Sequence, residues 1–151
     1  MKVIDLAPEL FEPYFAFFRP AHSHGRVPAR IKELARLRIA ILNGCNTCLF
    51  ARYTQAAQEG LDEATISQVH RPEAERALST REALAVRFAE RMATDFRSVD
   101  AEFMSELRKS FTDAEIAELG LMIGQYLAMG RLLVVLGGHE DACEIYTPPN
   151  G

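Results

Sequence analysis

Two cysteines three positions apart, Cys45 and Cys48, are the residues whose type and spacing best suit chemistry. The dipeptide Asn43-Gly44 before them is a helix stop signal, because Gly, and to a lesser degree Asn, tolerates the left-handed conformation at a helix end. A new helix should therefore begin near Cys45, where the helix amides favour an anion and lower the pKa of a thiol. The spacing also places both side chains on one side of the first turn, close enough to form a disulfide. The segment predicts a reactive thiol pair.

Two charged residues are candidates to assist this pair. Arg52 follows Cys48 by four residues, so on a continuous helix it shares a face with that cysteine and its charge favours a thiolate. It cannot shuttle protons, because arginine does not deprotonate in proteins. Glu33 lies twelve residues before Cys45, and it approaches the pair only if the chain after Gly44 runs back alongside. The ordinary alternatives are a solvated charge for Glu33, and an exposed charge or a salt bridge to Glu33 for Arg52.

The cysteine pair also has structural interpretations. The two residues could be small buried hydrophobes. They could instead form half of a zinc site, but structural zinc takes four protein ligands, and no second paired motif exists among the remaining candidates, His22, His24, His70, His139 and Cys143. We therefore expect neither a metal nor a cofactor. Cys143 could form an intermolecular disulfide, although a lone cysteine is usually inert.

Length and composition indicate one domain over residues 1–151. The chain is 48% apolar and 25% charged, which is typical of a globular protein with a hydrophobic core. Its net charge of −4 disfavours nucleic acids and anionic membranes as partners. Acidic residues interrupt the N-terminal segment where a signal peptide would be apolar, and Gln125 and Arg131 interrupt the longest apolar stretch, residues 119–137. Three cysteines do not suggest a disulfide framework, so we expect a cytoplasmic protein.

The apolar periodicity predicts helices and no strand of useful length. Asp5 is a candidate cap for a first helix with Pro8 in its opening turn, and residues 19–27 resemble a loop. Helices are expected over about 28–42, 45–60 and 62–70, and within 101–111. Ser79-Thr-Arg-Glu82 and Thr112-Asp-Ala-Glu115 are capping boxes that open two further helices, the second reaching about Leu136. Because residues 116–136 are apolar on nearly every side, another subunit is expected to cover part of that helix.

The segment 27–70 resembles the core of the carboxymuconolactone decarboxylase and alkyl hydroperoxidase D superfamily. The later stretch REALAVRFAERM, followed by FTDAEIAELGLMIGQYLAMGR, is similar to the C-terminal half of its peroxidase-related members. The resemblance therefore covers about residues 27–133. The residues that match the core pattern are Pro28, Arg30, Glu33, Asn43, Gly44, Cys45, Cys48, Gly60 and Leu61.

This resemblance implies an all-α fold built around a helical hairpin and assembled as a trimer or hexamer. Thiol members of the superfamily reduce peroxides. By that pattern, Cys48 attacks the peroxide and becomes a sulfenic acid, and Cys45 resolves it to a disulfide. A dithiol donor, such as a lipoylated protein, restores the pair, and Glu33 works with histidines in a proton relay.

The sequence departs from the family pattern at the relay. Arg52 stands where a histidine is expected, and Thr47 stands where the type enzyme has another. Loss of general-base help typically costs about 10²–10⁴-fold in rate. Charge from Arg52 and the helix N-terminus could compensate, or His22 or His24 could reach the site from the preceding loop.

Three functions follow from these residues. The first is a thiol peroxidase or disulfide oxidoreductase that acts on hydroperoxides. The second is a redox sensor or oligomeric binding protein on the same fold, which the missing histidines favour. The third is a decarboxylase-type lyase, which the presence of both cysteines disfavours because that branch does not depend on them.

Overall fold

The structure, a computed structural model, describes residues 3–69, 78–136 and 145–146, and its fold is all-α. The longer helices are α1 (Pro8–Ser23), α2 (Ala29–Asn43), α6 (Thr80–Thr94), α7 (Ala101–Arg108) and α8 (Asp113–Leu136). The shorter ones are η1 (Val3–Asp5), α3 (Asn46–Phe50), α4 (Thr54–Gln58), α5 (Glu63–Val69) and η3 (Phe96–Ser98). Two short strands, β1 (Arg52–Tyr53) and β2 (Ile145–Tyr146), pair in parallel, with Arg52 opposite Ile145.

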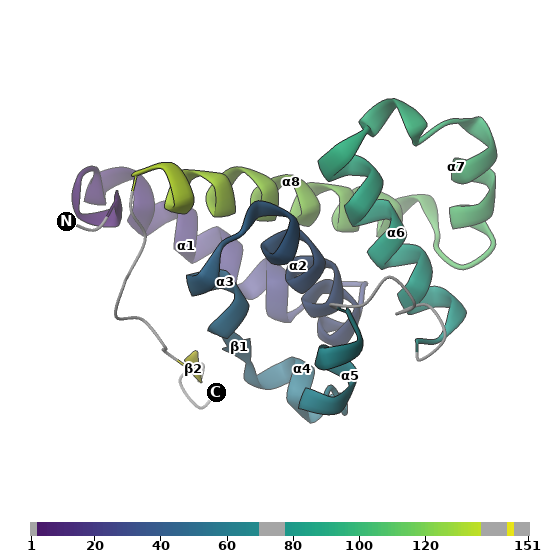
Figure 1. Ribbon diagram of the computed structural model, residues 1–151, viewed down its shortest axis with the longest axis horizontal. Coiled ribbons are helices and arrows are strands. Elements are labelled where there is room, and N and C mark those ends of the chain that lie inside the picture. Colours follow the sequence, from purple (N-terminus) through teal and green to yellow (C-terminus); the bar gives the residue numbers. More distant parts are fainter. Residues whose placement is uncertain (1–2, 70–77, 137–144, 147–151) are drawn as a thin grey trace.

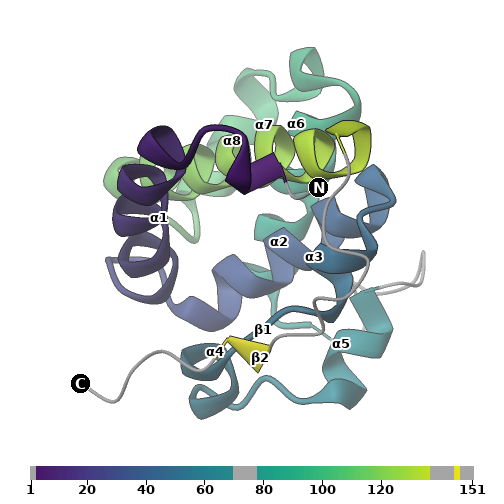
Figure 2. The same ribbon diagram turned by 90° about the vertical axis from the view of Figure 1, so that its left-hand side faces the viewer.

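Helix α2 is the central element of the molecule. It packs against both α6 and α8, while α4 and α5 lie along another side (Figure 1). Viewed end-on, α1 and α8 cover one side of α2, and α3, α4 and α5 lie on the other (Figure 2). Leu34 and Leu37 are fully buried on α2, and so are Lys32 and Glu33. A charged side chain buried this deeply needs a polar partner, so the polar contacts of α2 organise the interior.

Two apolar clusters flank α2. The larger cluster joins α1, α2, α6, α7 and α8, and the smaller one lies between α2, α4, α5 and α6. Both predicted capping boxes are confirmed. Ser79 and Glu82 bond each other's backbone N–H groups at the start of α6, and Thr112 and Glu115 do the same before α8. Helix α2 also ends as predicted, at Gly44 with a φ of 65°.

Three sequence predictions about the elements are wrong. Asp5 lies in η1, and α1 begins at Pro8 after Ala7 with no side-chain cap. The expected loop over 19–27 is helical as far as Ser23, because α1 continues through Pro20 while packing against α2 and α8. The expected helix over 45–60 is interrupted, since Ala51 adopts an extended ψ of 139° after α3 and α4 begins only at Thr54. The predicted features at His70 and beyond Leu136, including His139 and Cys143, lie outside the described residues.

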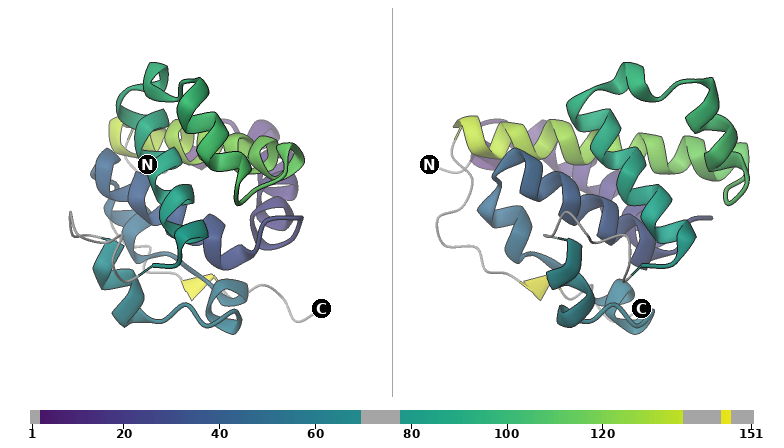
Figure 3. Two further views of the ribbon diagram at one scale, coloured as in Figure 1. Left: turned by 90° about the vertical axis from the view of Figure 1, so that its right-hand side faces the viewer. Right: turned by 45° about the vertical axis from the view of Figure 1, so that its right-hand side comes forward.

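Helix α8 differs from the other helices in how apolar its surface is. Among the described helices it alone is long and apolar enough to span a membrane, judged by length and composition. A core helix passes the same test, and α8 contacts α2, α6 and α1 along its length (Figure 3). Only 28% of its most apolar window is buried, however. The apolar side chains that it leaves in solvent are Leu121, Val134, Val135 and Leu136.

Candidate dithiol site

The two cysteines lie where α2 turns into α3. Cys45 is the N-cap residue of α3, and its sulfur accepts a hydrogen bond from the Cys48 backbone N–H at 3.3 Å. The two residues are joined as a disulfide, with their Cα atoms 5.3 Å apart. Cys45 is 2% exposed, whereas Cys48 is half-buried. Of the two sulfur-bearing residues, Cys48 is therefore the one more open to a substrate.

Arg131 of α8 holds Asn43, the last residue of α2. Arg131 donates through Nε to the side-chain oxygen of Asn43 at 3.2 Å, and through Nη2 to the carbonyl of Ala93. Gly130 leaves the space for this contact, because a Cβ at that position would meet the Asn43 amide nitrogen at 2.6 Å. The turn that presents Cys45 thus starts from a residue that α8 holds through Arg131, which is itself bonded to α6.

Glu33 is buried in the middle of α2, and its partner is Arg36, one turn later. The two Glu33 oxygens accept hydrogen bonds from Nε and Nη2 of Arg36, both at 2.6 Å. Burial alone would raise the pKa of Glu33, but the charge and hydrogen bonds of Arg36 hold that pKa at about 2. Glu33 is therefore ionised at neutral pH and is a weak base.

Arg36 also reaches the segment that carries the cysteines. Its Nη1 donates to the carbonyl of Cys48, and its Nη2 donates to the carbonyl of Ala51 at 2.9 Å. These are backbone groups at the end of α3, so α2 holds the dithiol segment through one guanidinium. Sequence analysis did not find Arg36. The available signal was its position three residues after Glu33 on the same predicted helix, a spacing at which opposite charges pair.

His22 comes from α1 and lies against Glu33. Its side chain is 0% exposed, with Nε2 3.3 Å from a Glu33 oxygen and Nδ1 2.6 Å from the Tyr126 hydroxyl of α8. Because a carboxylate only accepts hydrogen bonds, we assign the ring proton to Nε2, and Tyr126 then donates to Nδ1. Burial lowers the pKa of His22 although Glu33 opposes that effect, so the imidazole is neutral at pH 7. The Tyr53 ring lies against it, 3.9 Å between ring centroids.

Arg52 makes contacts different from those that the sequence predicted. Because α3 ends at Phe50, Arg52 does not share a helical face with Cys48. Its guanidinium pairs with Glu63, Nε to Oε1 at 2.7 Å, and donates to the carbonyls of Leu49 and Ala51. The predicted salt bridge from this position to Glu33 is made by Arg36 instead. His24, the other histidine considered for the site, is exposed.

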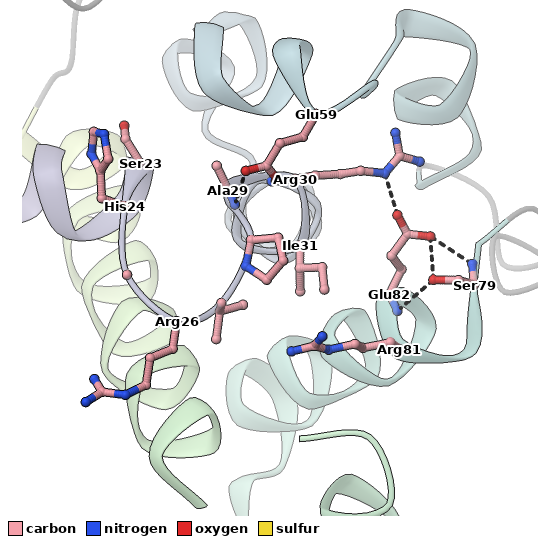
Figure 4. Close-up of a pocket in the computed structure, with 13 residues that line it drawn as sticks. Ser23, His24, Arg26, Ala29, Arg30, Ile31, Glu59, Ser79, Arg81 and Glu82 are labelled. Carbon is pink, nitrogen blue, oxygen red and sulfur yellow. Dashed lines mark hydrogen bonds and ion pairs between the residues drawn. The ribbon is translucent and has the colours of Figure 1, made fainter. Parts of the chain in front are cut away.

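A cleft of about 640 Å³ opens at the opposite end of α2 (Figure 4). In it Glu59 accepts hydrogen bonds from the first amides of α2, Ala29 and Arg30, and the Arg30 side chain pairs with Glu82. These charged groups are thus already paired within the chain. A helix of this length separates the cleft from Cys45 by about 20 Å, so the cleft is distinct from the dithiol. In the part of the chain that the structure describes, no group of three or more His, Cys, Asp or Glu residues is arranged to hold a metal ion.

Comparison with known proteins places the chain in a family. The sequence model of the carboxymuconolactone decarboxylase family matches residues 8–91, more than half of the chain. The protein therefore belongs to the carboxymuconolactone decarboxylase family, as its sequence predicted. No curated protein matches the chain significantly.

Two solved structures share the fold. One is a protein of unknown function from Agrobacterium tumefaciens, provisionally described as the antioxidant defence protein AhpD. It is 22% identical with a TM-score of 0.75, over 94% of this chain and 98% of that one. The other is an uncharacterised peroxidase-related protein from a Silicibacter species, 15% identical with a TM-score of 0.75, over 87% of this chain and 70% of that one. At these identities the likeness establishes the fold, which confirms the all-α prediction.

Proposed function

We propose that this protein is a thiol-dependent peroxidase or disulfide oxidoreductase that reduces hydroperoxides through Cys48 and Cys45. The observation that carries the proposal is the pairing of these cysteines at the start of α3, whose Cys48 carbonyl accepts a hydrogen bond from the buried Arg36 that also pairs with Glu33. Membership of a family with antioxidant and peroxidase-related relatives supports it. A decarboxylase would have no use for the dithiol.

The exposure of the two residues supports different roles. The more open Cys48, as a thiolate, attacks the outer oxygen of the hydroperoxide; the S–O bond forms, the O–O bond breaks, and an alcohol leaves after taking up a proton. Cys45, buried behind it, then displaces hydroxide from the sulfenic acid as water and forms the disulfide. A dithiol, such as that of a lipoylated protein, reduces the disulfide by two thiol exchanges and is itself oxidised. No cofactor is needed for this cycle.

The charged residues have supporting roles in this proposal. Glu33 is a member of the proton relay, and it also neutralises and orients Arg36. Arg36 holds the carbonyl groups at the end of α3, which keeps Cys48 in place relative to Cys45. Arg52, at the end of the same segment, adds to the positive charge that favours a Cys48 thiolate. We expect its contribution to be small because Glu63 pairs with it.

The test is peroxide consumption by the full chain with dihydrolipoamide as electron donor. We expect steady turnover that Cys48→Ser abolishes. Cys45→Ser should complete a single reaction with peroxide and then accumulate a sulfenic acid on Cys48, which dimedone traps. Turnover that survives Cys48→Ser, or a dimedone adduct on Cys45 alone, contradicts the assignment.

A redox sensor on the same fold is the second candidate, and one observation favours it. Glu33 is a weak base, and the residue found where the relay histidine belongs is Arg52, which pairs with Glu63. In a sensor, the dithiol of each chain is oxidised once by peroxide, and no donor reduces it fast enough for turnover. Stoichiometric oxidation without turnover, with dihydrolipoamide and other dithiols alike, would distinguish it from the enzyme.

We also infer that the protein is a homo-oligomer, a trimer or a hexamer. The apolar side chains exposed on α8 support this inference, because such a surface is normally covered in soluble proteins. A dithiol that must be restored after each reaction fits a reducing compartment, so the cytoplasm remains the proposed location.

A further inference from the structure

Helix α1 has apolar side chains on both sides, and the dithiol site uses neither of its outer ones. Phe18 and His22 point into the interior and are buried. Leu10 and Phe17, by contrast, are 66% and 48% exposed, and Pro13 between them is exposed as well. In Figure 2, α1 forms one edge of the described part of the molecule. The outer apolar side chains therefore lie where another molecule can reach them.

These outer residues have the spacing of a helix–helix contact. They follow one another at intervals of three, four and three positions, and together they form the α1 stripe: Leu10, Pro13, Phe17 and Pro20. Apolar residues repeated in this way make the seam between two packed helices, where each side chain fits between residues of the facing helix. A continuous exposed apolar surface usually marks an interaction site. The α1 stripe thus has the pattern of a seam whose second helix is not part of the same chain.

The charged residues beside the α1 stripe are separated by sign along the helix. Glu9 and Glu12 lie in the first half of α1 and Arg19 lies in the second half, and all three are exposed. Two parallel copies of α1 would bring each glutamate near its own counterpart. Two antiparallel copies instead bring the glutamates of one helix near Arg19 of the other, and opposite charges across an interface fix its orientation. The outer face of α1 is therefore complementary to itself in the antiparallel direction.

A lipid surface fits this face poorly. Helices that lie on anionic bilayers carry lysine and arginine along their polar side. Beside the α1 stripe two of the three charged residues are acidic, and the whole chain has a net charge of −4. A second copy of the chain offers what the bilayer lacks, which is an apolar seam of the same spacing together with an arginine near the two glutamates.

We propose that α1 packs antiparallel against α1 of a second copy about a two-fold axis, with the α1 stripes of the two chains as the seam. Such an interface is isologous, because both copies contribute the same residues. When the two stripes are aligned, Leu10 lies level with Pro20 of the second copy, and Pro13 lies level with Phe17 of the second copy. The four levels of apolar contact close both stripes from solvent.

The two-fold axis distinguishes between the two assemblies proposed above. A cyclic trimer has a three-fold axis alone, whereas a hexamer made of two trimers has two-fold axes as well. The α1 contact therefore selects the hexamer, and the exposed apolar end of α8, on a different helix, remains available for the three-fold contact. The choice of a hexamer rests on the oligomer proposed above, but the α1 contact depends neither on that proposal nor on the peroxidase activity.

Cysteine cross-linking tests both the contact and its direction. In the full chain with its three native cysteines replaced by serine, Leu10→Cys and Pro20→Cys are made singly and together, and a short bis-maleimide is added to dilute protein. The two positions are about 15 Å apart on one helix, too far to be linked within a chain. We expect the double variant to form a covalent dimer and both single variants to lose it. Single variants that cross-link as well as the double variant indicate parallel helices and overturn the proposal, as does a double variant that stays uncross-linked.

The mass in solution provides a second test. Phe17→Asp places an unpaired charge in the seam, so we expect light scattering to give half the wild-type mass, with the helical circular dichroism unchanged because Phe17 is exposed. Phe96→Asp alters an equally exposed phenylalanine on η3 and should leave the mass unchanged. An unchanged mass for Phe17→Asp overturns the α1 contact.

The outcomes separate this inference from the earlier proposals. A wild-type trimer overturns the α1 contact and leaves the proposed oligomer standing, whereas a wild-type monomer overturns both. Peroxide consumption by the same wild-type sample is a separate measurement. A hexamer that consumes no peroxide contradicts the proposed activity and supports the α1 contact.

Discussion

Arg36 donates a hydrogen bond through Nη1 to the carbonyl oxygen of Cys48, so the cation that holds the dithiol segment lies on α2. The same guanidinium makes a bidentate pair with Glu33, and both side chains are almost fully buried. Arg52, four residues after Cys48, makes an ion pair of another kind, because its partner Glu63 is 73% exposed. The two arginines therefore allow a direct comparison of a buried and an exposed ion pair at one site.

We expect Arg36→Met to lower the free energy of unfolding by about 3–5 kcal/mol, since it leaves the Glu33 carboxylate buried without its partner. Arg52→Met should cost less than about 1 kcal/mol, because water solvates Glu63 when the arginine is removed. Urea denaturation of the two variants checks this difference. Arg36→Lys, which keeps the charge but loses the two-pronged geometry, should fall between them. Equal costs for the two methionine variants would mean that the Arg36 pair does not hold the interior together.

The same arginines predict an effect on thiol reactivity. Arg36 holds the backbone of Cys48, and Arg52 contributes charge at the end of that segment, so each removal should raise the apparent pKa of the Cys48 thiol. We expect the larger rise for Arg36→Lys than for Arg52→Met, because a lysine cannot donate to both the Cys48 and the Ala51 carbonyls and so no longer holds the segment in place, whereas Arg52 contributes only a charge that Glu63 offsets. The pH midpoint of iodoacetamide alkylation measures both. A larger rise in the Arg52 variant would make Arg52 the main charge acting on the thiolate.

Stability should fall in two stages as the solution is acidified. The pKa of His22 is lowered from 6.5 by burial, so the unfolded chain binds this proton first and stability declines as the pH falls through 6.5. The pKa of Glu33 is held at about 2, below an ordinary 4.5, so its contribution of about 3 kcal/mol is complete above pH 4.5 and is lost toward pH 2. Urea denaturation at a series of pH values records both stages.

Single substitutions show which residue causes each of the two losses of stability. His22→Gln should remove the decline that begins near pH 6.5 and leave the one below pH 4.5. Glu33→Gln should remove the lower stage, and it should also lower stability at pH 7 because Arg36 then lacks its counter-charge. If the His22 variant keeps the same decline between pH 7 and 5, another group is responsible for that stage.

Lys32 of α2 anchors the end of α1 through hydrogen bonds to its backbone. Its fully buried ammonium group lies 2.6 Å from the Glu118 carboxylate and donates to the carbonyls of Ala21 and His24, which precede and follow the end of α1 at Ser23. Lys32→Met should therefore cost about 3 kcal/mol or more, measured by urea denaturation. Glu118→Gln keeps hydrogen-bond acceptors for Lys32 and should cost less.

The sequence predicted those parts of the molecule that local signals determine. Capping boxes, the Asn43-Gly44 stop and the apolar periodicity of α2 each depend on residues a few positions apart, and the structure confirms them. The break at Ala51 could not be predicted in this way, because the carbonyls of α3 find a donor in Arg36 from another helix. The contact of His22 with Glu33 likewise depends on the packing of α1 across α2. The sequence made His22 a candidate only as one of two loop histidines that could reach the site, and it did not indicate a buried contact from within α1.

The apolar side chains exposed at the end of α8 predict that the chain forms an oligomer. Val135 is 77% exposed, and Val134 and Leu136 beside it are half exposed, which is an unusual end for a helix that is apolar on nearly every side. We expect light scattering to give the mass of a trimer or hexamer for the wild-type chain, and Val135→Asp to shift it toward the monomer because a charge cannot be buried unpaired in an interface. Phe96→Asp is the matched control, since Phe96 is a large apolar residue that is also exposed but lies on η3. It should leave the assembly intact. A wild-type chain that stays monomeric at high concentration would mean that α8 carries its apolar surface for another reason.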